Sequence, residues 1–121
     1  MRRILAVDDD KDILEIIRYI LEDSGYEVDV LADGGKLFDR VKNYEPDLIL
    51  LDIMLGNLDG RELCRKLKES NDTKTIPVIL VSASHNPGKL NQEGAPNDFI
   101  AKPFDIDDLL GSISRQLNNA A

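Results

Sequence analysis

The chain has 121 residues, of which 42% are hydrophobic and 31% are charged, so it is long enough for one globular domain with its own core. Its formal net charge is −8, which argues against direct binding to nucleic acid or to an anionic membrane. A single cysteine excludes an internal disulfide, and we therefore expect a cytoplasmic protein.

Short apolar segments alternate with amphipathic segments along the chain. In chain order, they predict a strand at 4–7, a helix at 12–24, a strand at 26–31, a helix at 35–44, a strand at 48–51, a helix at 61–69, strands at 78–81 and 99–101, and a helix at 105–117 that begins at Asp105. Strands that alternate with helices indicate an α/β protein built from right-handed βαβ units around one parallel sheet.

The strands differ in how their apolar residues are arranged. The segments 4–7, 48–51 and 78–81 are apolar throughout, which predicts central strands that are covered on both faces. The segment 26–31 alternates and 99–101 is short, so both suit the edges of the sheet.

The stretch 85–97 does not follow this pattern. Leu90 is its only strongly apolar residue, and Pro87 and Pro96 interrupt it. We therefore expect the fourth helix of the alternation to be short or irregular.

Polar side chains follow the predicted strands at their carboxyl ends. Asp8 and Asp9 follow the first strand, and Asp52 ends the third. Ser82 ends the fourth strand, and Lys102 ends the fifth. Because the carboxyl ends of parallel strands lie at one edge of a sheet, these side chains should converge there from four separate loops.

Such a set of side chains favours phosphoryl chemistry. Three carboxylates in one cleft repel one another unless a cation intervenes, and Mg²⁺ (or Mn²⁺) prefers oxygen ligands. Lys102 adds a positive charge, and Ser82 can donate a hydrogen bond to a phosphoryl oxygen. Asp52 is then placed to attack phosphorus and form an aspartyl phosphate.

Five motifs of the chain resemble, in their order and spacing, those of the receiver domains of response regulators in two-component signalling. They are Ile4 to Asp10, Leu48 to Leu55, Leu58 to Gly60, Pro77 to Ala83, and Lys102 to Phe104. The resemblance covers nearly the whole chain and implies one receiver domain at 1–121. It also implies a flavodoxin-like fold, a doubly wound five-stranded parallel sheet of order 2-1-3-4-5 with helices on both faces.

The resemblance also implies roles for the site residues. It makes Asp52 the phosphoacceptor of a phosphorelay, with a phosphohistidine of a sensor histidine kinase or a histidine phosphotransfer protein as donor. Asp8, Asp9, Asp52 and the backbone carbonyl of Met54 would surround the Mg²⁺ ion. Lys102 would pair with the acceptor carboxylate.

Further residues are implied as parts of a switch. Ser82 and Phe99 would move when Asp52 is phosphorylated, shifting the population toward an active state. Met54 and Ser84 would flank the site and influence the lifetime of the aspartyl phosphate, which we expect to be longer with Met54 than with Asn at that position. The output partner is not specified, and we expect a monomer or a weak dimer.

Three other interpretations are open. A pseudo-receiver would act by protein contacts alone. A haloacid-dehalogenase-type phosphatase would use Asp8 and Asp10, but Asp12 stands where that family has threonine or valine. A flavodoxin-like binding module would need phosphate-binding donors in its first loop, which here carries carboxylates. We therefore expect a signalling phosphoacceptor domain and not an enzyme with a separate substrate.

Overall fold

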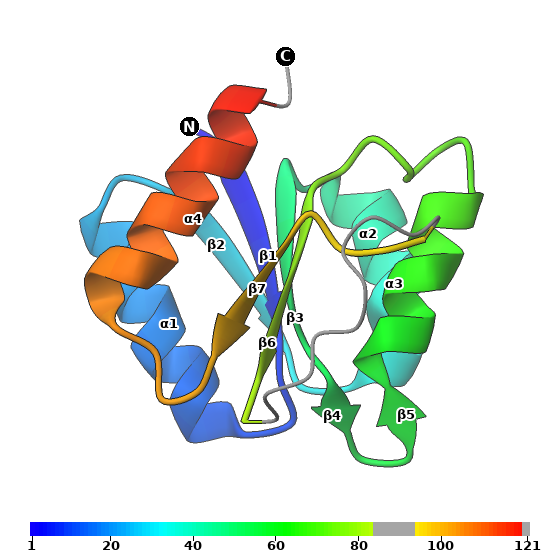
Figure 1. The fold of residues 1–121 in the computed structure, drawn as a ribbon, viewed down its shortest axis with the longest axis horizontal. Helices are drawn as coiled ribbons and strands as arrows, with labels where there is room; N and C mark the ends of the chain where they lie inside the picture. Colours follow the sequence, from blue (N-terminus) through cyan, green and yellow to red (C-terminus); the bar gives the residue numbers. More distant parts are fainter. Residues whose placement is uncertain (84–93, 120–121) are drawn as a thin grey trace.

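A computed structural model describes residues 1–83 and 94–119 (Figure 1). A parallel sheet forms its middle layer, with the strand order β2-β1-β3-β6-β7. These strands are β1 (Arg3–Val7), β2 (Glu27–Leu31), β3 (Leu48–Asp52), β6 (Val78–Ser82) and β7 (Asp98–Ala101). The predicted order is confirmed, with the alternating strand β2 and the short strand β7 at the two edges.

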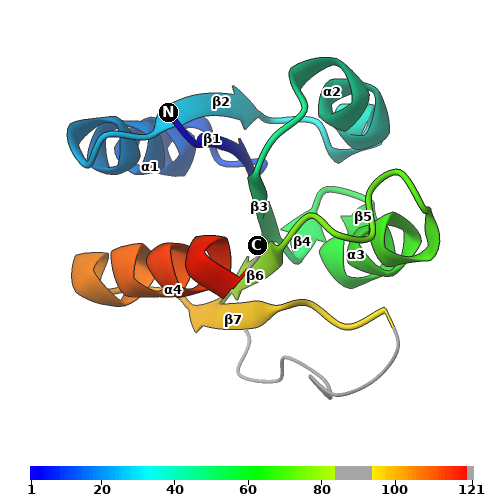
Figure 2. The same ribbon diagram turned by 90° about the horizontal axis from the view of Figure 1, so that it is seen from above.

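Helices cover both faces of the sheet (Figures 1 and 2). They are α1 (Lys11–Asp23) and α4 (Ile106–Asn119) on one face, and α2 (Leu37–Tyr44) and α3 (Gly60–Glu69) on the other. The predicted helix at 35–44 begins instead with a short 3-10 helix, η1 (Gly34–Lys36). The irregular helix expected within 85–97 falls almost wholly outside the described residues, which resume at Gly94.

A small antiparallel hairpin was not predicted. Its strands are β4 (Met54–Leu55) and β5 (Leu58–Asp59), which lie between β3 and α3. Two-residue strands are too short to show a periodic pattern in the sequence. The hairpin lies beside the start of α3, below that helix in Figure 1.

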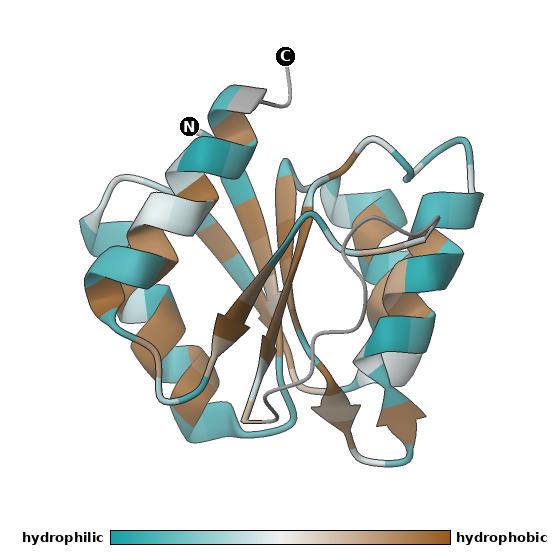
Figure 3. Ribbon diagram, in the orientation of Figure 1, coloured by the Kyte–Doolittle hydropathy of each residue, from teal (hydrophilic) through white to brown (hydrophobic). Residues whose placement is uncertain are grey.

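The sheet separates two apolar cores (Figure 3). Successive residues of a strand point to opposite faces, so Leu5 packs under α2 and α3 while Ile4 and Ala6 pack under α1 and α4. All residues of β3 and β6 are buried, as predicted for central strands. No helix in the described part of the chain is both long and apolar enough to cross a membrane.

Candidate functional site

The strand ends bring four predicted site residues to one edge of the sheet. Asp52 and Ser82 are the last residues of β3 and β6, while Asp8 and Lys102 directly follow β1 and β7. The ladder continues past the strands, because the amide of Asp8 donates to the carbonyl of Leu31 and that of Lys102 to the carbonyl of Ser82. Sheet hydrogen bonds therefore hold the backbone of the site.

Three carboxylates converge at this edge. One oxygen from each of Asp8, Asp9 and Asp52 lies within 4.8 Å of the others. Asp8 and Asp52 are buried, with exposed fractions of 3% and 6%, while Asp9 is exposed. Close oxygen ligands of this kind fit a hard divalent cation such as Mg²⁺.

Lys102 lies between two of these carboxylates. Its Nζ is 2.8 Å from Oδ2 of Asp8 and 3.5 Å from Oδ1 of Asp52. The ammonium is therefore closer to Asp8 than to the predicted acceptor. Burial alone would lower the pKa of Lys102, but its hydrogen bond and charge interactions with Asp8 and Asp52 outweigh burial and raise that pKa.

The surroundings of Asp52 make its ionisation unfavourable. Burial, followed by repulsion from the Asp8 carboxylate, raises the pKa of Asp52 to about 6. Lys102 opposes this shift, and Asp9 adds to it. The cluster thus holds more negative charge than Lys102 compensates, and a bound cation would relieve that repulsion.

The hairpin and α3 form the wall of the site next to Asp52. A Cβ at Gly60 would lie 2.0 Å from the carbonyl oxygen of Asp52, so only glycine fits where α3 begins. The amide of Gly60 also donates to the carbonyl of Ile53 at 2.6 Å. Asp59 caps α3, and the contact of Gly60 with Asp52 was not predicted from the sequence.

Met54 and Ser82 face one opening of the site. A cavity of about 400 Å³ is lined by these two residues and by residues of the hairpin and the start of α3. The Met54 side chain is 71% exposed, whereas Ser82 is buried. Ser84, predicted to influence the phosphate lifetime, lies outside the described residues.

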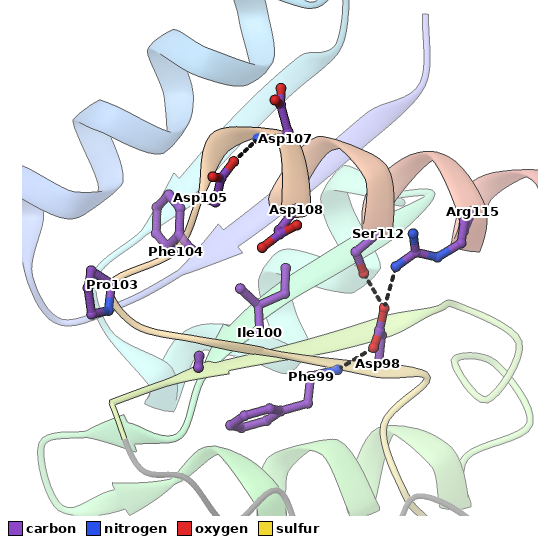
Figure 4. Close-up of a pocket in the computed structure, with 11 residues that line it drawn as sticks. Asp98, Phe99, Ile100, Pro103, Phe104, Asp105, Asp107, Asp108, Ser112 and Arg115 are labelled. Carbon is purple, nitrogen blue, oxygen red and sulfur yellow. Dashed lines mark hydrogen bonds and ion pairs between the residues drawn. The ribbon is translucent and has the colours of Figure 1, made fainter.

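Phe99 lies on the edge strand beside this site. Figure 4 shows Phe99 and Ile100 pointing to opposite sides of β7. Phe99 is half-buried against the core under α2 and α3, and Ile100 belongs to the core under α1 and α4. The start of β7 is tied to α4, because Asp98 accepts a hydrogen bond from Ser112 and pairs with Arg115 at 3.5 Å (Figure 4).

An apolar surface adjoins Lys102. A cavity of about 390 Å³ is lined by Ile13, Ile16, Ala83, Lys102, Pro103 and Phe104. Ile16 is 55% exposed, although its neighbour Ile17 is buried in the core. This surface lies between α1 and the loop after β7, next to the carboxylate cluster.

The family model of the response regulator receiver domain matches residues 4–114. The chain therefore belongs to the response regulator receiver domain family, as the sequence motifs predicted. It is a signalling domain of the kind found in two-component systems.

Curated relatives agree with this assignment. Response regulator MprA from Mycobacterium sp. (strain KMS) is 34% identical over 119 residues, covering 98% of this chain and 52% of the relative. MprA from Mycobacterium leprae (strain TN) is 36% identical over 111 residues, covering 92% of this chain and 49% of the relative. The chain thus spans about half the length of these curated relatives.

Solved structures share the fold over nearly their whole length. A receiver domain protein (CheY-like) from Methanospirillum hungatei JF-1 has a TM-score of 0.87 and 31% identity, covering 99% of this chain and 96% of that one. Chemotaxis response regulator CheY4 of Vibrio cholerae has a TM-score of 0.85 and 28% identity, covering 96% of this chain and 98% of that one. The predicted flavodoxin-like receiver fold is therefore confirmed.

Proposed function

We propose that Asp52 accepts a phosphoryl group from a phosphohistidine of a histidine kinase or a histidine phosphotransfer protein. The observation that carries this proposal is the carboxylate cluster, in which oxygens of Asp8, Asp9 and Asp52 lie within 4.8 Å of one another. Lys102 approaches the same cluster, 3.5 Å from Asp52. Together these groups place a nucleophile among charges that suit a phosphoryl group.

In the proposed step, a carboxylate oxygen of Asp52 attacks phosphorus. A new O–P bond forms, the P–N bond to the donor imidazole breaks, and the imidazole leaves with the electron pair of that bond. Lys102 offsets negative charge beside Asp52. Ser82, at the end of the neighbouring strand β6, would donate a hydrogen bond from its hydroxyl group to a phosphoryl oxygen.

We assign Mg²⁺ (or Mn²⁺) to Asp8, Asp9, Asp52 and the backbone carbonyl of Met54. Such an ion neutralises negative charge on the phosphoryl oxygens when it is bound. The oxygen donors fit a hard cation, and burial followed by repulsion from Asp8 raises the pKa of Asp52 at the same place.

Ser82 and Phe99 would carry the switch from the site to a downstream partner. They stand on adjacent parallel strands, β6 and β7, and Phe99 is only half-buried. Phosphorylation would favour the population in which both side chains have moved. Met54 and Ser84 would set how fast water removes the phosphoryl group, with slower loss for Met54 than for Met54→Asn.

The apolar surface beside Lys102 supports docking of the phosphohistidine protein. Exposed Ile16 with Pro103 and Phe104 offers apolar contact close to Asp52. We propose one receiver domain at 1–121, cytoplasmic, a monomer or weak dimer, with no direct contact to nucleic acid or membrane, as the net charge of −8 suggests. It would have no separate substrate, and its output partner is left open.

Intact-mass measurement after incubation with Mg²⁺ and acetyl phosphate tests the proposal. We expect one added phosphoryl mass on the wild-type chain and none on Asp52→Asn or in the presence of EDTA. Absence of added mass under every condition would contradict the proposal. Steady turnover of a small phosphate ester would indicate a phosphatase, and we expect none.

A further inference from the structure

Asp9 is held differently from the other two carboxylates of the cluster. Asp8 accepts hydrogen bonds from Lys102 and from the amide of Asp10, and Asp52 lies 3.5 Å from Lys102. Within residues 1–83 and 94–119, the carboxylate of Asp9 accepts one hydrogen bond, from the backbone amide of Gly56, at 3.3 Å. Asp9 is also exposed, so this one contact restricts a side chain that is otherwise free to rotate.

We propose that the backbone N–H of Gly56 orients the Asp9 carboxylate toward its neighbours and thereby strengthens the binding of a divalent cation. This inference rests on the proposed metal site. It assigns a positioning role to a residue that itself contacts neither the cation nor the phosphoryl group. Hydrogen bonds to ligating carboxylates commonly fix the orientation of the ligand and raise metal affinity.

The hairpin determines where this N–H points. Leu55 pairs with Leu58, which leaves Gly56 and Asn57 as a two-residue turn. Gly56 has a φ of 63°, the sign that a type II′ turn requires at its first central position, where glycine is favoured. The direction of the donor is therefore set by the turn and not by Asp9.

Packing below the hairpin holds the turn in place. Leu55 is buried, and its Cδ1 is 3.1 Å from the point where a Cβ of Gly34 would lie. The absence of a side chain at Gly34 thus lets Leu55 pack closely under η1. A donor anchored in this way is available before the cation binds, so ordering Asp9 costs less when it does.

The contact leaves Asp9 able to bind a cation. A carboxylate has two oxygens with about four lone-pair sites, and the bond from Gly56 uses one of those on Oδ2. Loss of such contacts typically lowers metal affinity about 10- to 100-fold. Because this bond is long and exposed, we expect a smaller effect, about threefold to tenfold.

A single backbone substitution tests the inference. Replacing Gly56 by glycolic acid turns its amide into an ester, which removes the N–H while keeping the freedom to adopt a positive φ. The only cysteine of the chain, Cys64, allows a synthetic 1–63 thioester to be ligated to 64–121. The matched control carries the same change at Gly35, whose amide donates to Asp33 outside the cluster.

Mn²⁺ is the probe, and the free ion is measured by electron paramagnetic resonance. We expect the dissociation constant to rise about threefold to tenfold for the Gly56 ester and to stay unchanged for the Gly35 ester. Unchanged or tighter binding by the Gly56 ester would overturn the inference. Failure of the unmodified chain to bind Mn²⁺ would overturn the metal site as well, so the two outcomes are distinguishable.

Hydrogen exchange gives a second measurement on the unmodified chain, independent of how the ester folds. If Gly56 and the cation act together on Asp9, the Gly56 amide exchanges more slowly with Mg²⁺ than without it. Faster exchange with Mg²⁺ would show that the cation and the amide compete for Asp9, which contradicts a positioning role.

Discussion

Aspartates at the strand ends and aspartates at the helix starts have opposite surroundings in this protein. Asp8 and Asp52 follow or end strands, are buried, and share one ammonium, that of Lys102. Asp10 caps α1 by accepting hydrogen bonds from two backbone amides of that helix, and Asp59 caps α3 by accepting one. The first pair gathers negative charge in one place, whereas the second pair satisfies amides that would otherwise lack a partner.

Position in the fold, and not residue type, decides what an acidic side chain contributes to stability. Asp8, Asp9 and Asp10 are consecutive, yet one is buried against Lys102, one is held by the hairpin, and one caps a helix. A cap stabilises the fold by itself. Crowded carboxylates lower stability unless a cation binds, which makes their region sensitive to metal and to phosphorylation.

Substitution of Gly60 should lower stability most, because this first residue of α3 packs against the carbonyl of Asp52 at the end of β3. Gly60→Ala would place a methyl group against the carbonyl of Asp52, so α3 must move away from the site. We expect a loss of roughly 2–4 kcal/mol in the free energy of unfolding, measured by urea denaturation. Gly111→Ala inside α4 is the control, because its Cβ would meet only Arg115 at 3.5 Å. A small change for Gly60→Ala would contradict the close contact.

Metal binding should raise stability through the carboxylate cluster of Asp8, Asp9 and Asp52, and not through the helix caps. Mg²⁺ at 100 times its dissociation constant should raise the free energy of unfolding of the wild type by about 2.7 kcal/mol, and EDTA should reverse it. Asp10→Ala should keep the same Mg²⁺ increment, because Asp10 caps α1 and lies outside the carboxylate cluster. Equal increments in the wild type and in Asp52→Asn would argue against a site that includes Asp52.

The pKa of Asp52 predicts a pH dependence. Because folding raises this pKa from 3.8 to about 6, the folded state binds more protons between these values, and stability falls as pH rises through them. Without metal, Asp52→Asn should therefore be more stable than wild type at pH 7.5, on the order of 1–3 kcal/mol. The two proteins should converge near pH 4. A wild type that is the more stable of the two at pH 7.5 would contradict a pKa of Asp52 raised by burial and by repulsion from Asp8.

Loss of the N-terminal cap of α1 should lower stability least. Asp10→Ala leaves the amides of Asp12 and Ile13 without their side-chain acceptor, which should cost about 1 kcal/mol in the free energy of unfolding. Asp10→Ser should recover most of this loss. Thermal unfolding of both variants tests the prediction, and equal stability of Asp10→Ala and wild type would contradict it.

Much of the fold could be predicted because its causes are local. Continuous apolar segments identified β1, β3 and β6 as central strands, and helical spacing identified the four helices of the described residues. Asp105 was predicted to begin the last helix, and its side chain accepts a hydrogen bond from the amide of Asp107. The hairpin was missed because its strands are too short to show a pattern.

The site likewise has features that the sequence predicts and features that depend on packing. The sequence was enough to predict that five polar side chains would meet, because carboxyl ends of parallel strands lie at one edge of a sheet. These side chains are Asp8, Asp9, Asp52, Ser82 and Lys102. Three contacts became visible only in the folded chain. Lys102 lies nearer to Asp8 than to Asp52, Gly60 packs on the Asp52 carbonyl, and the Gly56 amide donates to Asp9. These contacts join residues whose distances depend on how the hairpin and helices pack, and no local pattern in the sequence records that packing.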